Sequence, residues 1–208
     1  MSGRPPKARS RTVTSSSFPT DDWLAAVLAT PGLTGLRDLD SAREMLFKDA
    51  VRALPLINRY NGSLIDIGSG GGSPGIPIAV ALPGREVTLL DADRRKCDFL
   101  RRWAPPNARV VSGRAEEQPR EMWGVAMAKA LAQPATAAEW CLPLVRVGGA
   151  AILWLGVNAD RPRLARVSDR LGGGLPEWYE GLAVVPKVAP TPPRFPRRAG
   201  VAKKRPLA

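Results

Sequence analysis

The sequence contains no histidine, and this absence removes several common catalytic devices. Without histidine there can be no Ser-His-Asp triad, no histidine general base and no zinc site with a histidine ligand. Cysteine is also scarce: Cys97 and Cys141 lie too far apart to form a CxxC redox pair or a thiolate metal knuckle. We therefore expect no metal site and no disulfide framework, and we expect a protein of the reducing cytoplasm.

Long apolar runs are absent as well, and acidic residues are few. No stretch of about 18 apolar residues occurs, so we expect neither a transmembrane helix nor a membrane partner. The chain has 31 lysines and arginines against 19 acids, for a net charge of +12. Residues 1–20 and 187–208 contain cations and no acid, whereas residues 21–186 are nearly neutral. The positive charge is thus a property of the two ends.

Proline is frequent in both basic ends, and serine in the first, a composition typical of disordered chain. We interpret residues 1–20 as a basic disordered N-terminal tail and residues 187–208 as a basic, proline-rich C-terminal segment. Two roles are open: the charges either keep the protein soluble or contact the phosphate backbone of a nucleic acid. Residues 21–186 are long enough for one domain with its own core.

The middle of the chain alternates between two hydrophobic periodicities. Residues 21–60 have apolar positions at helical spacing and predict a helical cap, interrupted at Pro31-Gly32. Beyond it, the alternation of strand-like and helix-like stretches predicts an α/β fold with a parallel sheet covered on both faces. The predicted strands are 64–67, 86–90, 109–111, 125–128 and 150–155, and the predicted helices are 76–82, 94–103, 135–145 and 161–171. Residues 177–185 predict an edge strand, paired with 193–198.

A glycine-rich turn follows the first predicted strand, and two cofactor classes use such a turn. Gly70, Gly72 and Gly75 match the GxGxxG pattern of nicotinamide oxidoreductases, although the match begins late after the strand. The alternative is the Asp-x-Gly-x-Gly turn of class I methyltransferases. There Gly68 and Gly70 let the backbone pass close to S-adenosylmethionine, and Asp66 presents its carboxylate near the methionine end of the cofactor.

Two further strand ends favour the methyltransferase interpretation. Asp91 closes the second predicted strand, where an acid binds ribose hydroxyls, and residues 113–117 follow the third strand, where a turn packs the adenine. Three features at consecutive strand ends are stronger evidence than one glycine turn. An oxidoreductase and a glycine loop without a ligand remain as weaker alternatives, since Asp91 also suits a dehydrogenase but Asp66 does not.

These residues resemble those of the RsmG (GidB) family, methyltransferases of bacterial small-subunit ribosomal RNA. The resemblance runs from about residue 24 to residue 206, and the PGIP continuation of the glycine turn is its most specific part. The matching segments are 33–38, 48–51, 66–70, 74–77, 88–91, 99–100, 113–117 and 191–200.

The resemblance implies a class I S-adenosylmethionine-dependent methyltransferase with a Rossmann-like, seven-stranded, mostly parallel sheet that has two extra strands at its C-terminal edge. It implies methyl transfer to N7 of a guanosine, with 16S rRNA or the small ribosomal subunit as partner, and we expect a monomer. The family's cofactor contacts fall on Gly68, Ser73, Ala115 and Glu116, which join Asp66, Gly70 and Asp91. A further site falls on Lys129, the candidate catalytic residue facing the RNA.

The implied chemistry suits a protein without histidine. Guanine N7 has an in-plane lone pair and no proton, so its attack on a sulfonium methyl needs placement and no general base. Methylation of cytosine C5 needs a cysteine nucleophile, and neither cysteine lies in a suitable strand-end loop. Methylation of an exocyclic amine normally uses an Asn/Asp-Pro-Pro-aromatic motif, and residues 128–131 read Ala-Lys-Ala-Leu instead.

Three positions depart from the family's pattern. Lys129 replaces an arginine and loses its planar fork, Leu46 replaces a histidine, and Leu155 replaces a lysine. Three outcomes stay open: an active enzyme of altered efficiency, a methyltransferase acting on a different RNA, and an inactive paralogue that binds S-adenosylmethionine and rRNA. Of the tryptophans, Trp123 either packs in the core, the commoner arrangement, or stacks on a base, and Trp140 is interpreted as a core or seam residue.

Overall fold

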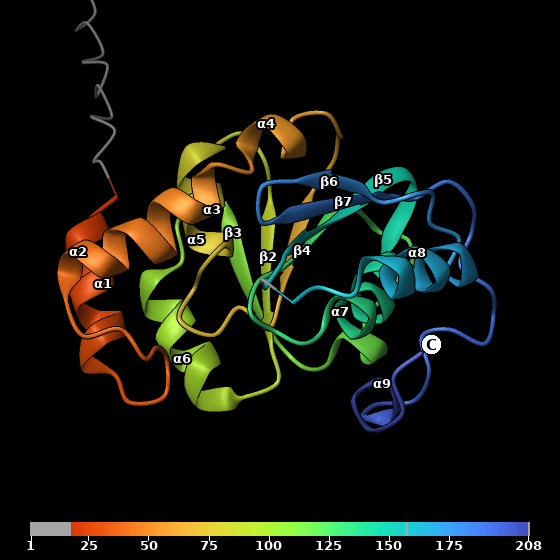
Figure 1. Cartoon of the computed structure of the whole chain (residues 1–208). Helices are drawn as coiled ribbons and strands as arrows, with labels where there is room; N and C mark the ends of the chain where they lie inside the picture. The colour runs from red at the N-terminus through yellow and green to blue at the C-terminus, as the bar shows by residue number, and fades with distance from the viewer. Residues whose placement is uncertain (1–17, 157, 208) are drawn as a thin grey trace, which may run out of the picture.

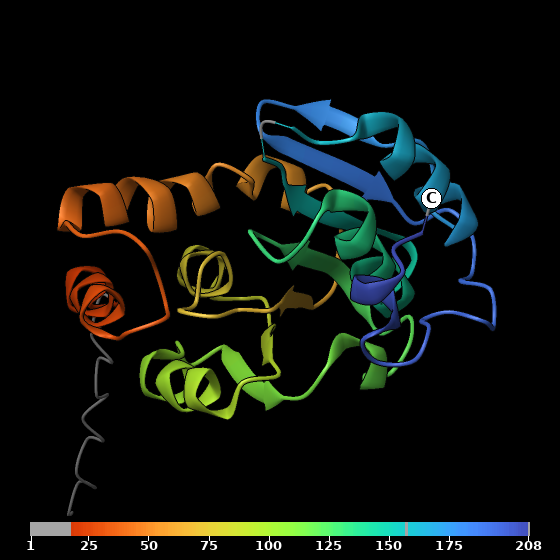
Figure 2. The same ribbon diagram turned by 60° about the horizontal axis from the view of Figure 1, so that its bottom comes forward.

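The computed structural model describes residues 18–156 and 158–207. A seven-stranded sheet lies at the centre, with the N-terminal helices at one end of the molecule and α8 and α9 at the other (Figures 1 and 2). The N-terminal tail predicted for residues 1–20 falls almost entirely outside the described residues. Within the described part of the chain, no helix is long and apolar enough to cross a membrane.

The sheet has the strand order β3-β2-β1-β4-β5-β7-β6. Strands β1 to β5 run parallel, and β7 runs antiparallel to both β5 and β6. The order reverses between β1 and β4, which opens a crevice at the carboxyl ends of these strands. The strands are β1 Leu64–Ile67, β2 Val87–Asp91, β3 Ala108–Ser112, β4 Trp123–Ala128, β5 Val145–Trp154, β6 Glu177–Tyr179 and β7 Leu182–Pro186.

Nine α-helices, one π-helix and two 3₁₀ turns of the described chain cover the sheet, as the alternating pattern predicted. One core cluster lies between the sheet and α7 and α8; the other lies between the sheet and the cap, α5 and α6. The cap consists of α1 Thr20–Ala29, α2 Leu39–Ala42, a π-helix Arg43–Lys48, α3 Asp49–Val51 and α4 Leu54–Ile57. The others are α5 Gly75–Ala81, α6 Arg94–Trp103, α7 Pro134–Cys141, α8 Arg161–Arg170 and α9 Val201–Lys204, with 3₁₀ turns at Ala115–Glu117 and Leu142–Leu144.

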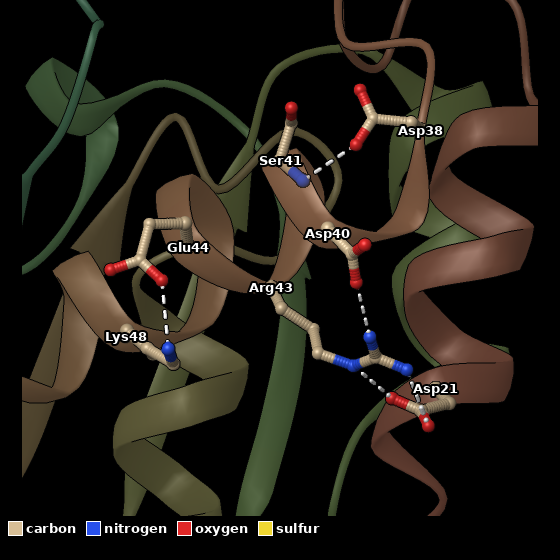
Figure 3. Close-up of polar contacts among 7 residues, drawn as sticks. All are labelled: Asp21, Asp38, Asp40, Ser41, Arg43, Glu44 and Lys48. Carbon is tan, nitrogen blue, oxygen red and sulfur yellow. Dashed lines mark hydrogen bonds and ion pairs between the residues drawn. The ribbon is translucent and has the colours of Figure 1, made fainter.

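The outer surface of the cap carries a small polar network (Figure 3). The Asp38 carboxylate accepts a hydrogen bond from the Ser41 N–H and caps α2. The Arg43 guanidinium pairs with Asp21 on α1 at 2.9 Å and with Asp40 at 2.7 Å. Exposed pairs of this kind contribute little to stability, because water already solvates both charges.

Burial of α1 attaches the cap to the rest of the protein. Trp23, Leu24 and Val27 are buried against the glycine-rich turn and the sheet. The Trp23 Nε1–H also donates to the Gly71 carbonyl at 2.9 Å, so the indole nitrogen is not left without a partner. The cap therefore rests directly on the turn that follows β1.

The predicted edge strand at 177–185 is a hairpin of two strands, β6 and β7, and its predicted partner is wrong. Gly181, with φ of 63°, allows the tight turn between the two strands. Residues 193–198 form no strand, because Phe195 is buried in the core beside α7 and α8 instead of standing at a sheet edge.

The disorder expected from composition is wrong for residues 187–207, which the structure shows packed on the body. Phe195 and Leu207 are buried in the core. The Arg197 guanidinium makes two hydrogen bonds of 2.5 Å to the Glu139 carboxylate, whose side chain is 1% exposed. The buried Lys187 ammonium donates to the Leu171 carbonyl at 2.7 Å. Composition could not predict these contacts, because each depends on a partner elsewhere in the sequence.

Candidate functional site

Three cavities meet at the carboxyl ends of β1, β2, β4 and β5. The β2–β3 cavity, of about 300 Å³, lies between the glycine turn and the ends of β2 and β3. The cap cavity, of about 340 Å³, lies between the same turn and the cap. The β4–β5 cavity, of about 660 Å³, lies between the cap, the loop after β4 and the end of β5. Ala130 lines all three, so the cavities adjoin one another at this residue.

Ala130 has a strained backbone at this junction. Its φ is 52°, in the left-handed region that residues with a Cβ seldom adopt. Such strain persists where the surrounding structure requires it and is concentrated at functional sites. The preceding residue, Lys129, lines both the cap cavity and the β4–β5 cavity.

Four of the predicted cofactor residues lie together on the β2–β3 cavity: Gly68, Asp91, Ala115 and Glu116. The Asp91 carboxylate accepts hydrogen bonds from the N–H groups of Gly70 and Asp93, both at 2.9 Å. Gly68 and Gly70 have φ values of 72° and 53°, which only glycine adopts readily. The acid at the end of β2 therefore holds the glycine turn in place while its side chain still lines the cavity.

The Glu116 carboxylate joins three parts of the protein. Its Oε1 accepts from the Trp140 Nε1–H of α7 at 3.1 Å and from the Gly200 N–H of the C-terminal segment at 3.2 Å. Trp140, expected to be a core or seam residue, is half-buried and lines the β2–β3 cavity. The C-terminal segment is thus attached to the cavity wall.

Asp66 lies beneath the glycine turn and lines none of the three cavities. The carboxylate is fully buried; its Oδ2 accepts from the Gly75 N–H at 3.0 Å, and its Oδ1 has no hydrogen-bond partner among the described residues. Burial raises the pKa of Asp66 to about 7, because a charged carboxylate loses its hydration there. A Cβ on Gly75 would lie 2.7 Å from Asp66 Oδ2 and 2.3 Å from the Leu89 side chain, so only glycine fits.

The hydrogen bonds at the start of α5 argue against the GxGxxG interpretation. A pyrophosphate at this position needs free N–H groups in the first helical turn. The Gly75 N–H donates to Asp66, the Ile76 N–H donates to the Gly72 carbonyl, and Pro77 has no N–H. At the start of α5 these N–H groups therefore support the fold itself and are not free to bind a dinucleotide.

The cap cavity contains Gly70, Ser73 and Lys129, and two of these side chains contact the π-helix. The Ser73 hydroxyl donates to the Leu46 carbonyl at 2.7 Å, and the Lys129 ammonium donates to the Met45 carbonyl. A π-helix changes the backbone pairing of an α-helix, and such segments occur frequently at functional sites. Leu46, at the family's histidine position, lines this cavity with an apolar side chain.

The β4–β5 cavity holds a charged cluster that sequence reasoning missed. The Asp49 carboxylate pairs through Oδ2 with Lys129 at 2.6 Å and through Oδ1 with Arg52 at 2.6 Å. Although burial alone raises the pKa of Asp49, the two cations outweigh it and hold that pKa below its usual value. The Trp154 Nε1–H fixes the Asp49 carbonyl at 3.1 Å. Asp49 is therefore an ionised acceptor at neutral pH.

Two further cations line the cavities. The Lys96 side chain, on α6, lines both the β2–β3 and cap cavities and makes no hydrogen bond or ion pair with the described residues; nothing in the sequence separated it from neighbouring cations. Arg52 supplies a cation in the cavity that contains Leu155, where the family's lysine is missing. Trp123 is buried, with its Nε1–H on the Thr88 hydroxyl at 3.2 Å, so its predicted packing role is confirmed.

The lining suits S-adenosylmethionine by the chemistry of its groups. Ile67, Leu90 and Leu131 supply apolar wall to the β2–β3 cavity, and Asp91 and Glu116 supply carboxylates for hydroxyl and amino donors. The cap cavity adds backbone and side-chain polar groups around the glycine turn. An adenosyl group with a charged amino-acid arm fits this combination.

Comparison with known proteins identifies relatives of the same kind. Residues 22–161 match the family model described as rRNA small subunit methyltransferase G. A Ribosomal RNA small subunit methyltransferase G from Synechococcus sp. (strain JA-2-3B'a(2-13)) is 37% identical over 205 residues, which cover 86% of this chain and 79% of the relative. A protein of the same name from Rubrobacter xylanophilus is 37% identical over 193 residues, covering 81% and 71% of the two chains.

Solved structures confirm the predicted fold class. A SAM-dependent O-methyltransferase from Thermotoga maritima superimposes with a TM-score of 0.54 at 13% identity, covering 70% of this chain and 66% of that one. The apo form of the S-adenosylmethionine-dependent methyltransferase SibL gives 0.51 at 15% identity, covering 80% and 62%. The fold is that of the class I methyltransferases, whose cofactor is S-adenosylmethionine. As the resemblance predicted, the chain belongs to the rRNA small subunit methyltransferase G family.

Proposed function

We propose that this protein transfers the methyl group of S-adenosylmethionine to N7 of a guanosine in 16S rRNA. We place the reaction on the small ribosomal subunit in the cytoplasm, with the protein acting as a monomer. Family membership supports the proposal. So does the position of Ala130, which lines both cavities around the glycine turn and the larger β4–β5 cavity.

The residues around the glycine turn would hold the cofactor. Gly68, Asp91, Ala115 and Glu116 would bind it in the β2–β3 cavity, and Gly70 and Ser73 in the cap cavity. Asp66 acts from below by fixing the turn through the Gly75 N–H. When bound, S-adenosylmethionine supplies an electrophilic methyl group on a sulfonium.

The β4–β5 cavity supports chemistry without a general base. Its carboxylate, Asp49, is held ionised by two cations, so its affinity for a proton is low. Guanine N7 has no proton to remove, and the rate then depends on how well the protein orients the nucleophile and excludes water. Lys129 serves this placement, because it ties the cap to the loop after β4 on both sides of the cavity.

The C-terminal segment supplies a basic surface beside the site. The buried anchors of the segment and the Gly200 contact with Glu116 hold the backbone that carries its exposed cations. Such a surface suits contact with RNA phosphates, which position an RNA without reading its sequence. The exposed cations are Arg194, Arg198, Lys203, Lys204 and Arg205.

A methyl-transfer assay tests the proposal. Purified protein and labelled S-adenosylmethionine are incubated with small ribosomal subunits that lack the modification. We expect label in 16S rRNA and strand scission at one guanosine after borohydride and aniline treatment, which cleaves at 7-methylguanosine. Label at another base or on another RNA contradicts the proposal. Binding of S-adenosylhomocysteine without any transfer identifies the inactive paralogue that the departures at Leu46, Lys129 and Leu155 left open.

A further inference from the structure

The β4–β5 cavity contains an ion pair with unused hydrogen-bonding capacity. The Lys129 ammonium has three donors, of which one goes to the Met45 carbonyl and one to Asp49 Oδ2. The Asp49 carboxylate has about four acceptor positions, of which Lys129 and Arg52 occupy two. One donor and two acceptor positions therefore remain, and both side chains line the cavity.

The donor and the acceptor lie side by side, since Lys129 Nζ and Asp49 Oδ2 are 2.6 Å apart. A purine ring presents neighbouring groups of the same kind on its six-membered ring. In guanine these are the O6 acceptor and the N1–H donor, which complement an ammonium beside a carboxylate. In adenine they are the N6–H donor and the N1 acceptor, in the reverse order. Adenine therefore matches the pair only with its ring turned over, which directs its N7 to the other end of the pair.

We propose that the β4–β5 cavity receives the target guanine, and that the Lys129–Asp49 pair binds its O6 and N1–H edge. This inference rests on the proposed function and specifies which residues select the base. The volume of about 660 Å³ is within the range of cavities that hold small ligands.

The contact leaves the reacting atom free. N7 lies on the opposite side of O6 from N1, so a guanine bound through O6 and N1–H keeps its N7 lone pair unoccupied. Ala130 lines this cavity and also the two cavities that would hold the cofactor, so the base and the cofactor would lie next to each other. The neighbours hold the pair in place: Arg52 and the Trp154 indole fix Asp49, and Met45 fixes Lys129. In the orientation that places N7 as in bound guanine, adenine leaves the groups of this preorganised pair unpaired, and this penalty discriminates against it.

The test varies the protein and the base together. Small subunits are reconstituted with 16S rRNA carrying guanosine or 2-aminopurine riboside at the nucleotide mapped in the methyl-transfer assay. The second base keeps N7 but lacks both O6 and N1–H. We expect wild-type kcat/KM to fall about ten- to hundredfold with 2-aminopurine. We expect Asp49→Asn to lower kcat/KM on guanosine by a similar factor. On 2-aminopurine, Asp49→Asn should be only slightly slower than wild type, because the contact that the substitution removes is already missing.

Asp40→Asn is the matched control, since it makes the same chemical change on the cap at an exposed pair with Arg43 (Figure 3). It should behave as wild type with both bases. Unchanged affinity for S-adenosylhomocysteine in Asp49→Asn shows that its cap is folded; if that affinity falls, Lys129→Met is measured in the same way. If the losses of kcat/KM caused by the protein substitution and by the base substitution simply multiply, for either variant, the inference is overturned. The proposed function still stands in that case, provided that wild type methylates N7. If wild type does not methylate N7 of guanosine, the function fails, and the inference fails with it.

Discussion

The two sides of Ala130 are built in different ways. On the cofactor side, backbone groups within one turn hold the site: Asp66 and Asp91 accept from the N–H groups of Gly75 and Gly70. On the β4–β5 side, residues from the cap, the loop after β4 and β5 hold the site: the Asp49 carboxylate pairs with Arg52 and Lys129, and the Trp154 indole donates to the Asp49 carbonyl. The first side is determined by a short sequence motif, and the second exists only when distant elements are packed together. Variants on each side of Ala130 test this difference.

The largest expected effect is on cofactor affinity. Asp91→Ala removes the acceptor for two backbone N–H groups and a carboxylate of the cavity wall, so the Kd for S-adenosylhomocysteine should rise about 10- to 100-fold by calorimetry. Asp49→Asn, on the other side of Ala130, should change it less than twofold. Equal losses in both variants would show that the two sides are not separate.

The next largest effect is on stability and concerns the close packing of the glycine turn. Gly75→Ala places a Cβ against Leu89 and Asp66 and should lower the free energy of unfolding by about 1–3 kcal/mol. Gly84→Ala is the control, because its Cβ would meet nothing within 4 Å. Urea unfolding of both variants measures the difference, and a Gly75→Ala protein as stable as the control would contradict the close packing.

The buried Asp66 predicts a pH dependence of stability. Its pKa is raised to about 7 in the folded protein from 3.8, so the folded state holds a proton that the unfolded state has lost. The contribution of this pKa shift to the free energy of unfolding is complete below pH 3.8. It decreases as the pH rises toward 7, by at most about 1.4 kcal/mol per pH unit. Asp66→Asn should remove this slope. Urea unfolding between pH 4 and 8 checks it, and identical slopes in the two proteins would refute the shift.

The smallest effect concerns the C-terminal segment. Replacing Lys203, Lys204 and Arg205 by glutamine should reduce the slope of log affinity against log salt for 16S rRNA by about 0.7–0.9 per contacted phosphate. Affinity for S-adenosylhomocysteine should stay the same, because none of these side chains lines the two cofactor cavities. The binding is measured at several salt concentrations, and an unchanged slope would remove this segment from the RNA interface.

Much of the cofactor side was predictable because its signals are local. Strand β1, the glycine turn and Asp91 at the end of β2 follow from apolar periodicity and from a motif of a few residues. The prediction for Asp66 was less complete: the residue was found, but its full burial beneath the turn depends on how α5 packs on β2. Trp140 packs against the core as expected, but its place in a cavity wall was not predictable, since it depends on the packed position of α7.

The sequence by itself determined the alternating strands and helices, the glycine turn with its acids, and the absence of histidine that restricts the chemistry. Tertiary structure decided the rest. It brought Asp49 and Lys129 within 2.6 Å, and it ordered a proline-rich basic end by burying Phe195 and pairing Arg197 with Glu139. The physical reason is range: a periodicity or a turn depends on neighbours in the chain, whereas these contacts join residues about 60 to 80 positions apart and form only when the sheet and cap are complete.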